Sequence, residues 1–281
     1  MTTRLRCAID SATTLLADAG INSARFDAEE LAAHLTGTER GRLPLIDSLD
    51  DAFFDRYHAV IAARSRRVPL QHITGTAAFG PLTLFVGPGV FIPRPETEVM
   101  LEWATAQRLP EAPIIVDVCT GSGALALALA QHWPAARVLG IDDSDAALGY
   151  AGKNSTGTTI ELVQADATEP GLLTGLDGQV DLLVANPPYV PEAVELEPEV
   201  SQHDPPHAVF AGPDGMAVIT AIVPLACRWL RPGGLFAVEH DDTTSVQTSE
   251  LIINTGLFDD VVAHPDLAGR PRFVTAMRSG R

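Results

Sequence analysis

The sequence has little positive charge and only one lysine. Its 281 residues contain 19 Lys and Arg against 36 Asp and Glu, which gives a formal net charge of -17 at pH 7, and Lys153 is the single lysine. Nucleic-acid binding rests on clustered Lys and Arg that neutralise phosphates. This balance therefore argues against a broad electrostatic contact with nucleic acid, and we expect no stable nucleic-acid partner.

Cysteine is also scarce. Cys7, Cys119 and Cys227 are widely spaced and odd in number, which excludes a disulfide framework or a Cys-X-X-Cys metal site and suits a reducing compartment. His203 and His207 are four residues apart, but the two prolines between them prevent a helix from presenting both. We expect no metal site.

Long apolar runs are absent as well. None approaches the roughly 18 residues that a membrane span needs, and Asp10 stands where a signal peptide requires its apolar region. The 46% hydrophobic content is ample for a core, and the length predicts one large or two unequal domains. We therefore expect a cytoplasmic protein with no membrane partner.

The beginning of the chain has helical spacing. Apolar residues recur with a helical period over 5–19, and Gly20 follows where a C-terminal cap would lie. Asp27 followed by Glu30 resembles a capping box that opens a second helix, and Asp50 is a suitable cap for a third. Residues 1–75 are thus predicted to form a small helical domain.

Three arginines end the third predicted helix: Arg64, Arg66 and Arg67. Cations at a helix C-terminus are favoured by roughly 0.3–1 kcal/mol each through the backbone dipole. We interpret the three as solvated capping charges rather than as contacts for an acidic partner.

A hairpin and an α/β fold are predicted for the remainder. Short β-prone runs with Gly-Pro and Pro-Gly over 77–92 indicate a β-hairpin, within a linker assigned to 76–98. From residue 114, apolar strand-like runs alternate with helical segments, which is typical of a mostly parallel sheet with helices on both faces. The last two runs can add an antiparallel hairpin at one edge, and the α/β domain is assigned to 99–281.

Successive strand ends in this sheet carry residues suited to a nucleoside. Gly121 and Gly123 follow the first strand and allow a tight turn close to a ligand, although a glycine pair alone is weak evidence. Asp142, about twenty residues further on, can accept hydrogen bonds from two ribose hydroxyls or simply cap the next helix. Asp166 and Ala167 end the third strand. Together, the three positions predict a binding crevice.

This order of residues resembles class I S-adenosylmethionine-dependent methyltransferases. The resemblance implies S-adenosylmethionine as the cofactor and S-adenosylhomocysteine as its product. It assigns the cofactor contacts to Asp117, Thr120, Gly121, Ser122, Gly123, Asp142, Asp143, Asp166, Ala167 and Asn186. Cys119 stands where that family commonly has glycine, and its small side chain should still permit the turn.

The fourth strand ends in the sequence VANPPY, residues 184–189. Proline has no N–H, so this loop offers carbonyl acceptors in a nearly fixed shape. Asn186 Oδ1 and the Pro187 carbonyl can receive both hydrogens of a planar –NH2 group and stabilise the charge that develops on its nitrogen, while Tyr189 supplies a ring wall. Asn186, Pro187 and Tyr189 are the predicted catalytic residues. The simpler alternative is a strand-terminating turn in which Asn186 satisfies local backbone groups.

Asn-Pro-Pro-Tyr resembles both N6-adenine nucleic-acid methyltransferases and protein glutamine N5-methyltransferases, so alone it specifies only a planar amine. The stretches PLQHITG, VGPGV and FIPRPETE resemble the bacterial glutamine methyltransferases of class I peptide chain release factors. The resemblance continues through DPPHAVFAGPDG to DLAGRPRFV near the C-terminus. It covers nearly the whole chain and implies methylation of the glutamine amide in the factor's Gly-Gly-Gln loop.

The same resemblance implies that 1–75 recognises the substrate, that 76–98 is a linker and that 99–281 transfers the methyl group; we expect a monomer. It assigns the substrate contacts to Arg94, Pro95, Glu96, Thr97, Asn186, Pro187, Pro188 and Tyr189. Ala211 and the stretch after Glu239 lack glycines that are common in the family. The alternatives are a ribosomal-protein glutamine, an adenine in nucleic acid, and a chain that binds without catalysis.

Overall fold

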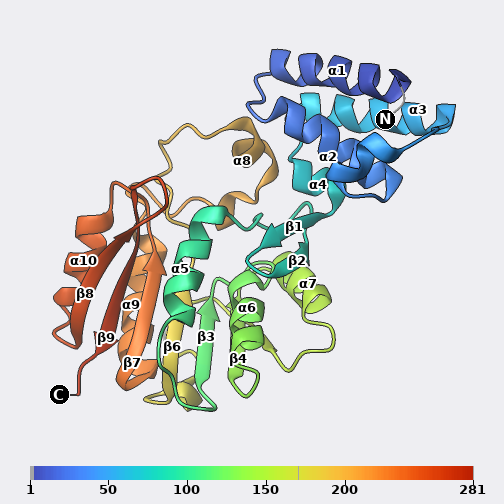
Figure 1. The fold of residues 1–281 in the computed structure, drawn as a ribbon. Coiled ribbons are helices and arrows are strands. Elements are labelled where there is room, and N and C mark those ends of the chain that lie inside the picture. The colour runs from blue at the N-terminus through green and yellow to red at the C-terminus, as the bar shows by residue number, and fades with distance from the viewer. Residues whose placement is uncertain (1–2, 170, 281) are drawn as a thin grey trace. The chain divides into compact units, whose positions relative to one another are not determined.

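The computed structural model describes residues 3–169 and 171–280, and its contacts divide the chain into two compact units (Figure 1). The first, here called the helical unit, comprises Met1–Thr76 together with Leu196–His203. The second, the sheet unit, comprises Ala77–Glu195 and Asp204–Arg281. The chain therefore leaves the sheet unit for eight residues, completes the helical unit and then returns.

The helical unit is built on amphipathic helices that share one apolar core. Its elements are α1 (Thr3–Asp18), α2 (Ala24–Thr36), the 3-10 helix η1 (Arg40–Leu45), α3 (Asp51–Ser65), α4 (Leu70–Thr74) and α8 (Pro198–His203). Leu5, Ile9 and Leu16 lie on one face of α1 and are fully buried. Asp50 caps α3, as the sequence predicts, because its Oδ1 accepts the Phe53 N–H at 2.8 Å.

The prediction that Asp27 caps α2 is wrong. The helix begins at Ala24, so Asp27 lies in its first turn, where it is buried with 2% exposure. Its Oδ2 accepts a hydrogen bond from Arg64 Nε at 2.7 Å, across to α3. The pattern of an acidic residue followed three residues later by glutamate thus reflects a tertiary ion pair rather than a capping box.

The interpretation of the three arginines as solvated is also wrong for two of them. Arg64 is buried and also donates to Glu199 Oε1 at 2.9 Å, while Arg67 donates through Nε to Glu199 Oε2 at 2.8 Å. Only Arg66 is exposed, at the C-cap position of α3. These arginines tie α8 to the rest of the helical unit through a glutamate more than a hundred residues away in the sequence.

A hairpin of β1 (Thr76–Phe79) and β2 (Leu82–Phe85) lies at the start of the sheet unit, with Thr76 itself counted in the helical unit, and the main sheet follows. The remaining strands are β3 (Ile114–Val118), β4 (Arg137–Asp142), β5 (Glu161–Gln164), β6 (Val180–Ala185), β7 (Leu230–Glu239), β8 (Phe258–Pro265) and β9 (Pro271–Arg278). Its α-helices are α5 (Pro95–Thr105), α6 (Ala124–His132), α7 (Asp145–Asn154), α9 (Ala217–Trp229) and α10 (Ser245–Ile253). Two 3-10 helices complete the unit: η2 (Thr174–Leu176) and η3 (Pro206–Ala208).

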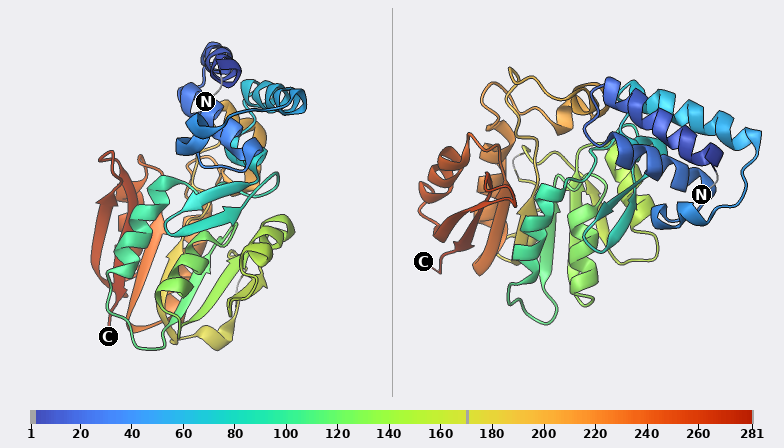
Figure 2. Two further views of the ribbon diagram at one scale, coloured as in Figure 1. Left: turned by 45° about the vertical axis from the view of Figure 1, so that its right-hand side comes forward. Right: turned by 45° about the horizontal axis from the view of Figure 1, so that its top comes forward.

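The seven strands form one sheet in the order β5-β4-β3-β6-β7-β9-β8. Figure 2 shows the twist of this sheet. The five strands from β5 to β7 are parallel, and β9 and β8 add the antiparallel edge. The predicted α/β fold with an antiparallel edge and a hairpin is confirmed. The strand order reverses at β3, because β4 lies on one side of it and β6 on the other, and ligands of such sheets bind at the carboxyl end of this point.

Each face of the sheet is covered by helices. Alternate side chains of β6 explain how: Leu182 and Val184 pack with α5 and α6, whereas Leu183 and Ala185 pack with α9 and α10. All four are fully buried, as expected for a parallel strand covered on both faces. Within the described residues, no helix is both long enough and apolar enough to cross a membrane.

Candidate active site

The carboxyl ends of β3 and β4 bring the glycine turn and Asp142 together. Val118 is in register with Ile141, so the turn after β3 lies beside the end of β4. Asp142 Oδ2 accepts the Gly121 N–H at 2.8 Å, and its Oδ1 accepts the Ser144 N–H at 3.0 Å. Burial raises the pKa of Asp142, and these two hydrogen bonds partly oppose the rise. Asp142 thus lies beside the glycine turn and orders it.

Asp117, in β3, also stabilises the glycine turn through hydrogen bonds. Its Oδ2 accepts the Thr120 hydroxyl at 2.6 Å and the Ala126 N–H at 3.0 Å, which links the end of β3 to the first turn of α6. Its Oδ1 is buried and has no hydrogen-bond partner among the described residues. Burial raises the pKa of Asp117 to about 7, against the two hydrogen bonds that lower it.

The backbone of the turn is left-handed at three alternate positions, Cys119 (φ 60°), Gly121 (φ 58°) and Gly123 (φ 84°). This conformation favours glycine, which explains why Cys119 is a departure; its turn forms nevertheless. A Cβ built on Gly121 would meet no atom within 4 Å, so the open backbone there can be approached by a ligand. Ser122 is buried, and its Oγ has no hydrogen-bond partner among the described residues.

Asp166, at the third predicted strand end, is hydrogen-bonded to its own loop rather than to the glycine turn. Asp166 Oδ1 accepts both the Thr168 N–H and the Thr168 hydroxyl at 2.7 Å, and these hydrogen bonds, the hydroxyl first, lower the Asp166 pKa. Ala167 is buried. Asp143 contributes its carbonyl, which accepts from Gln164 Nε2 at 3.2 Å. Within the part of the chain that the structure describes, no side-chain hydrogen bond joins Asp143 or Asp166 to the glycine turn.

The Asn-Pro-Pro-Tyr loop leaves β6 next to the glycine turn, because Val118 is also in register with Ala185. Pro187 is buried, and Asn186 and Tyr189 are half-buried. A Cβ on Gly215 would lie 2.2 Å from the Tyr189 carbonyl oxygen, so the segment before α9 packs directly against this loop. The loop is therefore held by its neighbours and not only by its own prolines.

A hydrogen-bonded chain joins this loop to α5 and β7. Asn186 Nδ2 donates to Thr97 Oγ1 at 3.1 Å, and the Thr97 hydroxyl donates to Glu239 Oε2 at 2.8 Å. The Tyr189 hydroxyl donates to the other oxygen, Glu239 Oε1, at 2.9 Å. Glu239 is 1% exposed. It is not among the predicted site residues, although an acidic residue that ends a buried strand at this edge is a signal that could have identified it.

The residues around the start of α5 belong only partly to this hydrogen-bonded cluster. Thr97 is buried in it, whereas Pro95 and Glu96 are exposed at the start of the helix. Arg94 forms an ion pair with the buried carboxylate of Asp204, and its guanidinium lies 4.8 Å from the centroid of the Phe91 ring. Pro188 is half-buried.

The two departures from family glycines do not distort the backbone. Neither Ala211 nor Asp241 is among the described non-glycine residues with positive φ. Ala211 is buried, and its N–H donates to the Val190 carbonyl at 3.0 Å. A glycine is therefore not required by the conformation at either position.

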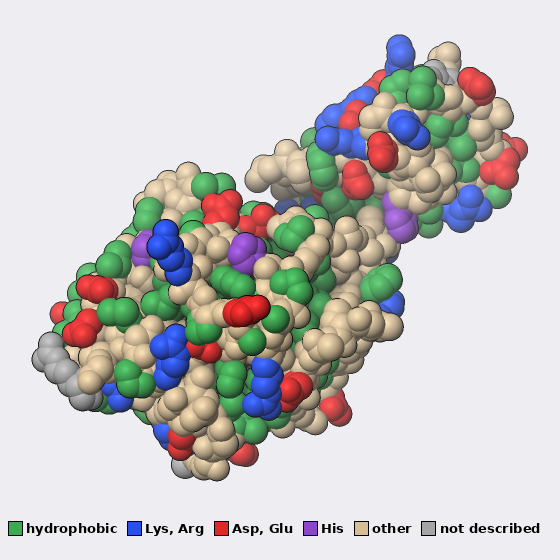
Figure 3. Space-filling model, turned by 60° about the horizontal axis from the view of Figure 1, so that its bottom comes forward, with side chains coloured by type: hydrophobic (Ala, Val, Ile, Leu, Met, Phe, Trp, Pro, Cys, Tyr) green, Lys and Arg blue, Asp and Glu red, His purple; other side chains and the backbone are tan. Residues whose placement is uncertain are grey.

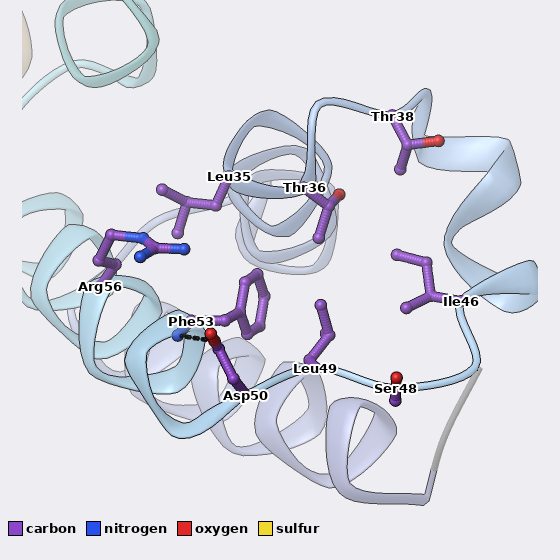
Figure 4. A pocket seen from close by; sticks show the side chains of 9 residues that line it. All are labelled: Leu35, Thr36, Thr38, Ile46, Ser48, Leu49, Asp50, Phe53 and Arg56. Atoms are coloured by element: carbon purple, nitrogen blue, oxygen red, sulfur yellow. Dashed lines mark hydrogen bonds between the residues drawn. The ribbon is translucent and has the colours of Figure 1, made fainter.

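A pocket in the helical unit is lined by none of the predicted site residues (Figure 4). It is lined by Leu35, Thr36, Thr38, Ile46, Ser48, Leu49, Asp50, Phe53 and Arg56. Its one carboxylate, Asp50, is the cap of α3, as the dashed line in Figure 4 shows.

The sequence is similar to those of known methyltransferases over nearly its whole length. A family model described as the PrmC N-terminal domain matches residues 8–75, and one described as a methyltransferase domain matches residues 115–197. The chain is 67% identical over 280 residues to the release factor glutamine methyltransferase of Mycobacterium tuberculosis, with 98% of this chain and 92% of that protein covered. It is 62% identical over 279 residues to that of Mycolicibacterium smegmatis, with 99% of each covered.

More distant relatives are also similar. The 4-amino-L-phenylalanine/4-methylamino-L-phenylalanine methyltransferase of Streptomyces pristinaespiralis is 39% identical over 267 residues, with 92% of this chain and 90% of that protein covered. Among solved structures, a 16S rRNA N2 methyltransferase of T. thermophilus in complex with AdoMet and guanosine shares the fold. Its TM-score is 0.52 at 23% identity, over 72% of this chain and 49% of that one. The chain therefore belongs to the release factor glutamine methyltransferases, a family whose methyl donor is S-adenosylmethionine.

Proposed function

We propose that this chain transfers a methyl group from S-adenosylmethionine to the side-chain amide nitrogen of the glutamine in the Gly-Gly-Gln motif of class I peptide chain release factors. The observation that carries the proposal is the hydrogen bond from Asn186 Nδ2 to Thr97 Oγ1. It uses the amide's donor inside the protein and leaves Asn186 Oδ1 as an acceptor for a substrate –NH2 group. The relatives named as release factor glutamine methyltransferases, up to 68% identical, support the choice of substrate.

The residues at the ends of β3 and β4 fit the cofactor. The open space at Gly121 allows close approach to the backbone, Asp142 can accept from ribose hydroxyls, and Asp117 Oδ1 is a buried acceptor with no partner among the described residues. When bound, S-adenosylmethionine supplies a methyl group on a positively charged sulfur. Thr120, Ser122, Gly123, Asp143, Asp166 and Ala167 complete the proposed cofactor contacts.

The chemistry of the loop follows from the weakness of an amide nitrogen as a nucleophile, since its lone pair is delocalised. Asn186 Oδ1 and the Pro187 carbonyl would accept its two hydrogens and stabilise the positive charge that develops on the nitrogen during attack. The proton can leave afterwards, so no general base is needed beforehand. Burial and the neighbouring Glu239 carboxylate hold the Tyr189 pKa well above its usual value, so Tyr189 acts as a neutral wall.

We assign substrate recognition to residues 1–75, a linking role to 76–98 and methyl transfer to 99–281. Arg94, Pro95, Glu96 and Pro188 are proposed to line the path of the glutamine. The exposure of Pro95 and Glu96 and the fixed position of Arg94 support this assignment. We further propose that the protein acts as a monomer in the cytoplasm, on release factors and without a stable nucleic-acid or membrane partner.

The charge distribution supports a protein substrate over nucleic acid. The sequence is strongly acidic, and the positive side chains of the sheet unit lie scattered on the face drawn in Figure 3 rather than in a continuous stripe. A nucleic-acid methyltransferase must hold a polyanion, which a formal net charge of -17 does not favour.

The proposal is tested by incubating the protein and methyl-labelled S-adenosylmethionine separately with a release factor, a ribosomal protein, DNA and 4-amino-L-phenylalanine. We expect label on the release factor and none on the same factor after its Gly-Gly-Gln glutamine is replaced. Label on DNA alone, on the ribosomal protein alone, or on the factor without its loop glutamine contradicts the proposal. Absence of label from every acceptor, with the cofactor bound, indicates a chain that binds without catalysis.

A further inference from the structure

Glu239 is not among the proposed substrate or cofactor contacts, but it is hydrogen-bonded to two of the proposed site residues, Thr97 and Tyr189. It ends β7 beside the end of β6, because Val238 is in register with Ala185. Its two oxygens accept from hydroxyls on two different elements, Thr97 on α5 and Tyr189 in the Asn-Pro-Pro-Tyr loop. Glu239 is only 1% exposed, so solvent does not stabilise its carboxylate, and a buried carboxylate is costly unless protein groups bind it.

The ionisation of Glu239 sets the direction of the hydrogen bonds that run from it through Thr97 to Asn186. A carboxylate can only accept, so Thr97 must donate its single hydroxyl hydrogen to it. The Thr97 oxygen can then only accept from Asn186, and a side-chain amide that meets an acceptor must present its nitrogen. The Asn186 oxygen is thereby left on the opposite side of the amide, away from Thr97.

We propose that Glu239 is a positioning residue for methyl transfer: through the Thr97 hydroxyl it holds the Asn186 amide with Oδ1 turned toward the substrate –NH2. This inference rests on the proposed function, because it concerns the acceptor that Asn186 offers to the glutamine. The bond from Tyr189 to the second oxygen of Glu239 fixes the other end of the same loop. One buried carboxylate thus orders both polar side chains of the motif.

Protonation of Glu239 would remove this control. A protonated carboxyl can donate to Thr97, which frees the Thr97 hydrogen to point at Asn186 and favours the reversed amide. The charged and titratable groups that face Glu239 are Arg272 on β9, which lowers its pKa, Glu96 on α5, which raises it, and the Tyr189 hydroxyl. Burial is the largest influence and raises the Glu239 pKa to about 7.

The first test removes the relay without touching a charge. Thr97→Val keeps the shape of the side chain but offers the Asn186 amide neither an acceptor nor a donor, so the amide loses its preferred orientation and kcat should fall by about 10-fold. Thr97→Ser restores the hydroxyl and should recover most of that loss. Thr105→Val is the matched control, because its hydroxyl on the same helix bonds only to helix carbonyls of α5; its kcat should remain within about twofold of wild type.

The second test changes the carboxylate itself. Glu239→Gln can donate to Thr97 at every pH, so kcat should be lowered and its dependence on pH near 7 reduced, whereas turnover of the wild type should fall as the pH decreases through about 7. Asp117 has a pKa in the same range, so the readout is the ratio of the two enzymes at each pH. Calorimetric affinity for S-adenosylmethionine should stay within about twofold for all variants.

The outcomes separate the two proposals. If the wild type does not methylate the release factor glutamine, the proposed function fails whatever the variants do. If the wild type is active but Thr97→Val retains its kcat, or if Thr97→Ser recovers nothing, the relay is overturned. Loss of cofactor affinity in Thr97→Val together with its kcat would assign Thr97 a structural role and would also overturn it.

Discussion

Replacement of Arg64 by methionine should destabilise the helical unit strongly. The side chains of Arg64 and Asp27 are 7% and 3% exposed, and their Nε and Oδ2 atoms lie 2.7 Å apart. Removal of one partner from a buried ion pair leaves an uncompensated charge and costs about 3–5 kcal/mol. Glu199 also loses its contact with Arg64 but keeps Arg67, so we ascribe most of the cost to Asp27.

Hydrogen exchange of the amides in α2 and α3 measures this effect, because it reports the opening of the helical unit directly. The three tryptophans, Trp103, Trp133 and Trp229, all lie in the sheet unit. Their fluorescence during denaturation therefore reports the unfolding of the sheet unit and serves as an internal control. Arg64→Met should shift this unfolding transition less than it speeds amide exchange in α2 and α3.

Arg137→Met is the matched substitution, because Arg137 pairs with Glu161 while both side chains are about half exposed, at 51% and 47%. Its cost should be about 0–1 kcal/mol. The double variant Asp27→Leu/Arg64→Met removes both buried charges and should regain much of the loss. A cost for Arg64→Met no larger than for Arg137→Met, or a double variant less stable than the single one, would refute the reasoning.

Other predictions concern the site. Asn186→Ala should lower kcat by about 10²-fold or more while the affinity for S-adenosylmethionine stays nearly intact. Asp142→Ala should instead weaken the affinity for S-adenosylmethionine. Steady-state kinetics measure the first effect and calorimetry the second, and the reverse pattern would contradict the assigned roles. Gly215→Ala, whose Cβ would lie 2.2 Å from the Tyr189 carbonyl oxygen at φ 75°, should displace the loop and lower kcat more than it lowers the melting temperature. Because burial raises the Asp117 pKa from 3.8 to about 7, the stability that this group contributes is present below about pH 4 and is lost as the pH rises to about 7. Asp117→Asn should therefore flatten the dependence of unfolding free energy on pH in this range, as urea titrations can measure; an unchanged slope would be inconsistent with a raised pKa.

Much of the fold is predictable because it follows from local patterns. Apolar runs such as 180–185 have the length and composition of buried parallel strands, and their alternation with helical segments specifies the α/β class. The glycine turn and Asp142 could be placed together because both follow strand ends of one parallel sheet. The strand order, with β3 between β4 and β6, follows from tertiary pairing that no single segment encodes.

The failures share a cause in distant partners. Arg64 is interpreted as a solvated end of a helix because the glutamate that it pairs with is 135 residues away. Asp27 fits the spacing of a capping box, and only its neighbour on α3 reveals its other role. Glu239 follows an apolar strand, and its importance becomes visible only when Thr97 and Tyr189 converge on it.

The excursion of the chain through Leu196–His203 limits how the two units can be exchanged between proteins. A chimera that joins a foreign helical unit before residue 77 would keep this chain's own α8, with Glu199 facing a surface that lacks Arg64 and Arg67. A functional exchange must transplant both pieces together. The ion pairs between Glu199 and the two arginines therefore disfavour transfer of residues 1–76 alone, because the partners are encoded on either side of the glycine turn.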